Sequence, residues 1–111
     1  MIVRLKQFHP DYPDLTPNQP DAVIGIEADD FRILNDRGQS FLYPHTLFES
    51  IDSQVPIDWI KVYGEDGEQY AYPLELNEVG FFEDYFDGDD QRIATFWRVV
   101  NQHLAFAEKV K

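Results

Sequence analysis

The apolar residues at the start of the chain follow the short spacing that is typical of β-strands. Residues 1–8 (MIVRLKQF) therefore predict an opening strand. Residues 9–21 contain four prolines, which remove backbone donors and fix φ, so we expect an extended connection there rather than a helix or a central strand. Within this connection, Tyr12 and Leu15 are expected to pack under the sheet or barrel that it crosses.

Residues 22–78 predict a run of short strands that includes two hairpins. The segment AVIGIEA is rich in β-forming residues, and its Gly25 indicates a bulge or a close backbone approach. The segments FRILNDRGQSFLY and DWIKVYGEDGEQYAY each alternate apolar and polar residues on both sides of a glycine-containing turn.

The two hairpins form an internal repeat, because residues 30–49 align with residues 59–78 at an offset of 29. The identical pairs are Gly38/Gly67, Tyr43/Tyr72, Pro44/Pro73, Leu47/Leu76 and Glu49/Glu78. Two copies are too few for a solenoid. We interpret them as one supersecondary unit used twice: a hairpin, a Tyr-Pro exit and a short turn with a buried leucine. A pair of equivalent ligand sites is the functional alternative.

The last stretch of the chain has helical spacing. Residues 79–86 predict a short aromatic turn, and Asp89 or Asp90 is placed to cap a longer helix from about residue 90 to about residue 109. The apolar face of this helix is predicted to contain Ile93, Trp97, Val100 and Leu104, broadened by Phe96, Val99 and Ala107.

Together these elements predict an α+β fold. We expect a twisted antiparallel sheet or an open small β-barrel of about five or six strands, packed against one C-terminal helix. The whole chain is expected to form one domain, residues 1–111, with a strand-rich part at 1–78, a proline-rich loop at 9–21 and a helical part at 79–111.

Charge and composition narrow the function. The chain has 21 acidic and 9 basic residues, a net charge of −12, which argues against a surface that binds nucleic acid through its phosphates. The absence of cysteine excludes disulfides, thiol nucleophiles and cysteine-ligated metals. No long apolar run predicts a signal peptide or a membrane span, so we expect a soluble cytoplasmic protein.

The acidic residues are concentrated in one segment. No basic residue lies between Lys61 and Arg92, whereas ten acidic residues do. Solubility with ordinary helix capping is one explanation, and a surface that attracts a basic partner is the other. The partner-binding residues predicted on the second hypothesis are Glu65, Asp66, Glu68, Phe82, Glu83, Asp84, Tyr85, Asp87, Asp89 and Asp90. Phe82 and Tyr85 are expected to be the aromatic anchors.

Other chemistry has little support in the sequence. The acidic segment EDYFDGDDQ lacks the alternate ligands and the downstream Glu of a calcium loop, so we expect no dedicated metal site. His9, His45 and His103 have no ligand spacing, and no glycine-rich phosphate loop is present. Neither an enzyme nor a cofactor is therefore predicted, although paired carboxylates leave a small hydrolase as a third possibility.

Two resemblances add expectations. Residues 23–52, with a strand of the V-x-G-I type, a hairpin around N-D-x-G and a Y-P exit, resemble small Src-homology-3-like barrels of bacterial proteins. That resemblance implies a barrel without catalytic residues. In size, acidity and lack of cysteine the chain is similar to bacterial immunity proteins, which cover the basic cleft of a nuclease toxin.

The function predicted from these observations is a protein-binding inhibitor. Most concretely, we expect an immunity protein or antitoxin that occludes a basic, nuclease-type toxin through an acidic surface, with no direct contact to nucleic acid or membrane. The alternative is a non-catalytic structural or regulatory interaction module whose acidity only promotes solvation.

Overall fold

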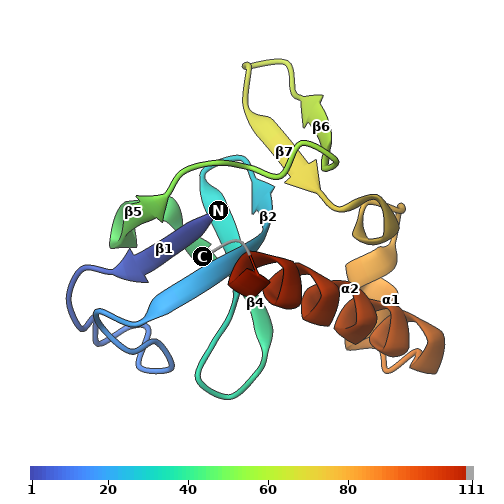
Figure 1. The fold of residues 1–111 in the computed structure, drawn as a ribbon. Coiled ribbons are helices and arrows are strands. Elements are labelled where there is room, and N and C mark those ends of the chain that lie inside the picture. The colour runs from blue at the N-terminus through green and yellow to red at the C-terminus, as the bar shows by residue number, and fades with distance from the viewer. Residues whose placement is uncertain (110–111) are drawn as a thin grey trace.

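The computed structural model describes residues 1–109, and the side chains of residues 1–104 (Figure 1). This part of the chain forms seven strands and two α-helices. They are β1 (Ile2–Leu5), β2 (Pro20–Glu27), β3 (Asp30–Leu34), β4 (Ser40–Pro44), β5 (Phe48–Asp52), β6 (Ile60–Tyr63), β7 (Gln69–Tyr72), α1 (Phe81–Phe86) and α2 (Asp90–Lys109). The α+β prediction is confirmed. The seven strands are slightly more than the five or six expected.

The strands form one antiparallel sheet that is not closed into a barrel. The order is β4-β3-β2-β1-β5, and β7 pairs with both β2 and β6. Strand β2 is the centre of this arrangement, since Ala22 pairs with Ile2 of β1 and Ile26 pairs with Ala71 of β7. Because β3 and β7 both pair with the last residues of β2, they lie on opposite edges of it. The β6–β7 hairpin projects away from the rest of the sheet (Figure 1).

Strand β2 also separates two hydrophobic clusters. Its side chains Val23 and Ile26 belong to the first cluster, whereas Ile24 belongs to the second. A strand that is covered on both faces needs a nearly continuous apolar run, which explains the sequence AVIGI. The first cluster contains Val3, Leu5, Leu15, Val23, Ile26, Ile33, Tyr43, Phe48, Trp59 and Ala71. The second contains Ile24, Tyr72, Leu76, Phe81, Phe96, Val99 and Val100.

The proline-rich connection packs on the first hairpin, β3–β4. Leu15 is only 2% exposed, and the ring of Tyr12 lies edge-on to Tyr43 with 5.7 Å between centroids. Both contacts were expected from the sequence. One detail of the prediction was wrong, because Pro20 already begins β2. A proline is compatible with the first residue of a strand, where its missing N–H interrupts little of the ladder.

The internal repeat is reproduced in the structure. In each hairpin turn the first residue donates its N–H across the turn: Asn35 to the carbonyl of Gln39 at 2.9 Å, and Gly64 to that of Glu68 at 2.8 Å. Gly38 and Gly67 have φ values of +74° and +80°, which favour glycine at these positions. Both Tyr-Pro exits lead into a single 3-10 turn, His45–Leu47 in the first copy and Leu74–Leu76 in the second. The buried leucine expected in each turn is found only in the second copy, because Leu76 is buried whereas Leu47 is partly exposed.

The helices follow the sequence pattern in extent but not fully in orientation. Asp89 caps α2, because its Oδ1 accepts a hydrogen bond of 3.0 Å from the N–H of Arg92. The buried face of α2 is formed by Phe96, Val99 and Val100. Two residues predicted on the apolar face of α2 are not buried, since Trp97 and Leu104 are 37% and 43% exposed. Ala107 lies outside the described side chains.

Among the described residues, neither α1 nor α2 is long and apolar enough to cross a membrane.

Candidate partner-binding groove

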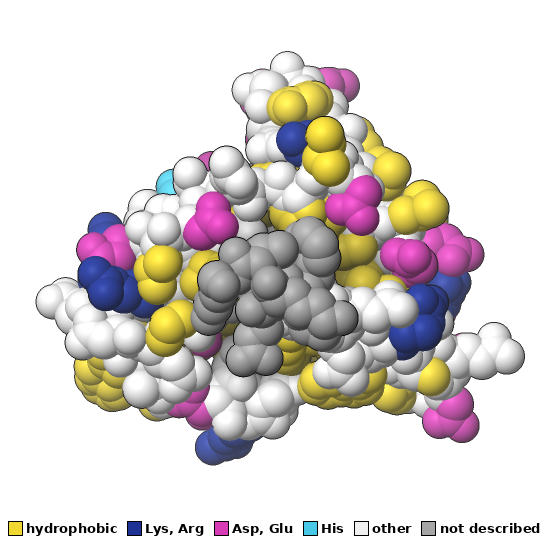
Figure 2. Space-filling view, viewed as in Figure 1, with side chains coloured by type: hydrophobic (Ala, Val, Ile, Leu, Met, Phe, Trp, Pro, Cys, Tyr) yellow, Lys and Arg dark blue, Asp and Glu magenta, His cyan; other side chains and the backbone are white. Residues whose placement is uncertain are grey.

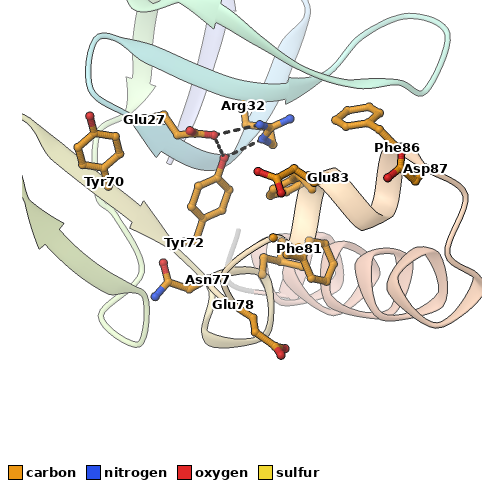
Figure 3. Close-up of a pocket in the computed structure, with 13 residues that line it drawn as sticks. Glu27, Arg32, Tyr70, Tyr72, Asn77, Glu78, Phe81, Glu83, Phe86 and Asp87 are labelled. Carbon is orange, nitrogen blue, oxygen red and sulfur yellow. Dashed lines mark hydrogen bonds and ion pairs between the residues drawn. The ribbon is translucent and has the colours of Figure 1, made fainter.

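A buried polar network lies where β2, β3 and β7 meet (Figure 3). Arg32 donates from Nε to the hydroxyl of Tyr72 at 2.7 Å and from one terminal nitrogen to Glu27 at 2.9 Å. The hydroxyl of Tyr72 in turn donates to the same oxygen of Glu27 at 2.5 Å. The second terminal nitrogen of Arg32 donates to the carbonyl of Ser40 at 2.9 Å. All three nitrogens of the guanidinium are therefore engaged within the protein.

Strand pairing and one glycine place these side chains. Glu27 ends β2, directly beside Tyr70 of β7, and this register brings Tyr72 across the backbone of β2. A Cβ on Gly25 would lie 2.0 Å from Cε1 of Tyr72, so only glycine lets the tyrosine ring lie against the strand. The bulge that Gly25 predicts is confirmed by a register shift between Val23 and Gly25, and the group that approaches the glycine closely is the side chain of Tyr72.

Burial of this network affects the hydroxyl of Tyr72. Arg32 is 6% exposed, and its guanidinium carbon lies 3.8 Å from the ring centroid of Phe82. Burial is the main cause that raises the pKa of Tyr72, although the charge of Arg32 opposes the increase. Tyr72 is therefore a neutral donor at physiological pH, and Glu27 balances the charge of Arg32. The three side chains are hydrogen-bonded to one another and form a polar floor.

An open groove with a volume of about 860 Å³ lies over this floor, between β7 and α1. Tyr70 stands on the β7 side and Phe86 on the α1 side, while the carboxylates of Glu83 and Asp87 lie along α1 and its end (Figure 3). The groove thus combines aromatic rings with negative charge. Its full lining is Glu27, Arg32, Tyr70, Tyr72, Leu76, Asn77, Glu78, Gly80, Phe81, Phe82, Glu83, Phe86 and Asp87.

Three of the predicted partner-binding residues line the groove, namely Phe82, Glu83 and Asp87. The remaining seven do not line the groove. They are Glu65, Asp66 and Glu68 in the β6–β7 turn, Asp84 and Tyr85 on α1, and Asp89 and Asp90 at the start of α2.

The expected aromatic anchors, Phe82 and Tyr85, are less exposed to solvent than Phe86. Phe82 is largely covered by Arg32 and Tyr72, and Tyr85 packs on Phe96 with 4.7 Å between ring centroids. The ring that α1 offers to solvent is Phe86, which is 50% exposed and stacks on Phe41 of β4 at 5.7 Å. A helix of six residues turns only part of its aromatic side chains outward, and the sequence pattern FFEDYF does not indicate which.

Several of the ten clustered acids have local structural roles. Arg92 donates to Glu78 at 2.7 Å and to Asp84 at 3.4 Å, and the hydrogen bond from Arg92 lowers the pKa of Glu78. Glu68 accepts a hydrogen bond from the N–H of Asp66 within the turn, and Asp89 caps α2. Four of the acids therefore contribute to the fold itself, whereas Glu83 and Asp87 face the groove.

The sequence did not indicate Glu27, Arg32, Tyr70 or Tyr72 as site residues. The one available signal was Arg32, a cation between the apolar residues Phe31 and Ile33 in a strand that neighbouring strands cover. Tyr72 gave no separate signal, because the repeat aligns it with Tyr43, whose hydroxyl accepts from Asn35 at 3.2 Å.

In the part of the chain that the structure describes, no three His, Asp or Glu side chains are grouped so as to hold a metal ion. No protein-family model, no curated protein and no solved structure matches the chain.

Proposed function

We propose that this protein is a protein-binding inhibitor, of the immunity-protein or antitoxin kind, that occludes a basic partner such as a nuclease toxin. The groove between β7 and α1 is the observation that carries the proposal. It offers carboxylates and aromatic rings together, and in its floor the charge of Arg32 is already paired with Glu27.

The physical argument concerns both encounter and residence. A net charge of −12 attracts a basic surface over a distance of about one Debye length, roughly 8 Å at physiological salt, and so raises the association rate. Once the surfaces meet, a desolvated aromatic centre slows dissociation. Tyr70 and Phe86, which are 36% and 50% exposed, are suited to that second role.

One feature favours the alternative, an interaction module whose acidity serves only the fold and its solvation. Four of the ten clustered acids already have local structural partners, as described above. Apolar docking through such a module would be insensitive to ionic strength, whereas electrostatic attraction weakens as salt is added.

The experiment uses the full chain, immobilised, to capture partners from a lysate of the source organism at low and at high salt. The association rate of the captured partner is then measured with the wild type and with two matched double variants. Glu83→Lys with Asp87→Lys reverses two groove charges, and Asp11→Lys with Asp58→Lys reverses two exposed charges that do not line the groove.

We expect the groove variant to lower the association rate at low salt by about tenfold, with a much smaller effect from the control variant. Because both variants change the net charge equally, a difference between them reports the position of the charge. Equal effects of the two variants, or an association rate that salt does not change, would contradict the proposal and favour the interaction module.

A further inference from the structure

The outer part of the second hairpin exposes an aliphatic side chain at a position that is buried in the first hairpin, while the aromatic residue paired with it is partly exposed in both copies, Tyr70 at 36% and Phe41 at 40%. Val62 and Tyr70 are directly paired across β6 and β7, so their side chains share one face. Val62 is 51% exposed, whereas its equivalent in the first copy, Ile33, is fully buried. Figure 2 shows hydrophobic side chains gathered over this projecting hairpin.

The first copy shows what kind of segment fits such a face. The proline-rich connection lies there, with Leu15 in the same hydrophobic cluster as Ile33. Its backbone and side chains also bind the hairpin turn. The carbonyl of Asp14 accepts from the N–H of Asp36 at 2.8 Å, and the carboxylate of Asp14 pairs with Arg37 at 3.3 Å.

The electrostatics of the second copy are the reverse of this arrangement. The offset of 29 places Asp66 where the first copy has Arg37. In the first copy, Arg37 at this position pairs with the acidic Asp14. Asp66 in the second copy would instead favour a basic residue as its partner. The charge of the turn therefore argues against a second copy of this acidic chain as the occupant, and in favour of a basic segment.

The exposed face also continues into the groove described above. Tyr70 belongs to both, since it pairs with Val62 on the hairpin and lines the groove opposite α1. A segment that crosses Val62 and Tyr70 would next meet the carboxylates of Glu83 and Asp87. The exposed apolar face, the acidic residue in its turn and its continuity with the groove all favour a basic segment as the occupant.

We propose that the outer face of the β6–β7 hairpin binds an extended segment of the basic partner. This segment places a large apolar side chain on Val62 and Tyr70 and a neighbouring Lys or Arg on Asp66. In the first copy, Leu15 shares a cluster with Ile33, the equivalent of Val62, and Asp14 pairs with Arg37, the equivalent of Asp66. The inference rests on the proposed function and specifies which element of the partner is recognised.

The test titrates the isotope-labelled full chain with a synthetic peptide of residues 9–19 that carries Asp11→Lys and Asp14→Lys. Amide shifts in two-dimensional NMR spectra report where the peptide binds. We expect shifts confined to β6–β7, its turn and α1, with a dissociation constant of about 1 mM. The unsubstituted peptide, which is acidic, is the control and is expected to leave these amides unchanged.

Two matched variants of the protein sharpen the test. Val62→Asp places a charge on the proposed face, and Ile51→Asp does so at a residue of β5 with nearly the same exposure, 49% against 51%. We expect binding about tenfold weaker for Val62→Asp and unchanged for Ile51→Asp. Asp66→Lys should weaken binding by about threefold, since one exposed ion pair is lost.

The possible failures are distinguishable. Shifts at β3–β4, or the absence of shifts at β6–β7, overturn this inference even when the charge variants at Glu83 and Asp87 still slow capture of a basic partner. Conversely, specific peptide binding supports the hairpin face as a site for basic segments. If the charge variants at Glu83 and Asp87 then had no effect on association, only the inhibitory role of the groove would be overturned.

Discussion

The two hairpins have the same turn, the same register and the same Tyr-Pro exit, yet their equivalent cations lie in different surroundings. Arg32 of the first copy is 6% exposed and bound to Glu27, Tyr72 and a backbone carbonyl. Its equivalent Lys61 is exposed on β6. The difference arises from the neighbours, because β3 lies between β2 and β4, whereas β6 pairs with β7 at the edge of the described sheet.

The comparison shows that the role of each copy of the repeated hairpin depends on which other elements pack on it. Both faces of the first hairpin are used for stability, one by the proline-rich connection and the other by α1. The second hairpin contributes Ala71 and Tyr72 to the two clusters, and its outer residues remain at the surface. Substitutions at equivalent positions should therefore affect stability in the first copy and binding in the second.

The largest difference is expected for the equivalent cations. Arg32→Ala leaves Glu27 and Tyr72 without their partner in a covered site, and we expect a loss of about 3 kcal/mol in the free energy of unfolding. Lys61→Ala should change that free energy by less than about 0.5 kcal/mol. Urea denaturation of the two variants measures both values, and losses of equal size would break the comparison.

The next difference concerns the equivalent aliphatic residues. Ile33→Ala removes a fully buried side chain, so we expect a loss of about 2–3 kcal/mol from the cavity it leaves. Val62→Ala should be nearly neutral for stability, since half of that side chain is already in water. Thermal unfolding provides the measurement. A loss for Val62→Ala as large as that for Ile33→Ala would show that the outer face is covered in solution.

A smaller difference is expected for the two exit tyrosines. Tyr72→Phe removes a hydroxyl that bonds to both Arg32 and Glu27, which should lower the free energy of unfolding by about 2 kcal/mol. Tyr43→Phe removes one neutral hydrogen bond to Asn35, for which about 1 kcal/mol is expected. Chemical denaturation of both variants tests this order, and the reverse order would contradict the assigned network.

The smallest effect is a pH dependence at Asp21 of β2, whose carboxylate is influenced by Asp36 in the turn of the first hairpin. Burial raises the pKa of Asp21 from 3.8 to about 6, with a further increase from Asp36 in the first turn, although the amide of Gln19 opposes it. Between about pH 4 and pH 6 the folded state binds more protons than the unfolded state, so stability falls as the pH rises.

Asp21→Asn should remove this fall and make the protein more stable at pH 7 by about 1 kcal/mol, a value reduced by the partial exposure of the side chain. Denaturation midpoints measured from pH 4 to pH 7 give the result. If the denaturation midpoint of Asp21→Asn changed with pH as steeply as that of the wild type, another group would be responsible for the pH dependence.

Local patterns predicted the elements well. The offset of 29, the glycines of the two turns and the caps of α2 depend on residues close together in sequence, and the structure contains these features where they were expected. Gly25 signalled a close approach for the same reason, because a glycine within an apolar strand is uncommon without a steric cause.

The candidate site was predicted only in part, since it depends on contacts between distant strands. Glu27, Arg32 and Tyr72 meet because β7 pairs with β2, and no local pattern specifies that pairing. Charge crowding predicted Glu83 and Asp87 as partner-binding residues, and both line the groove. It also predicted Asp84, which pairs with Arg92, and it omitted Glu78, which lines the groove and pairs with Arg92. Side-chain direction on the short helix α1 decided which ring is exposed.

The most direct test of the account is amide hydrogen exchange of the full chain, measured alone and in complex with the captured basic partner. The account predicts that the partner slows exchange in β6, β7 and α1, while exchange in β3 and β4 stays as it is in the free protein. Slower exchange confined to β3, β4 or α2, with β6 and β7 unchanged, would contradict the claim that the second hairpin and its groove form the binding surface.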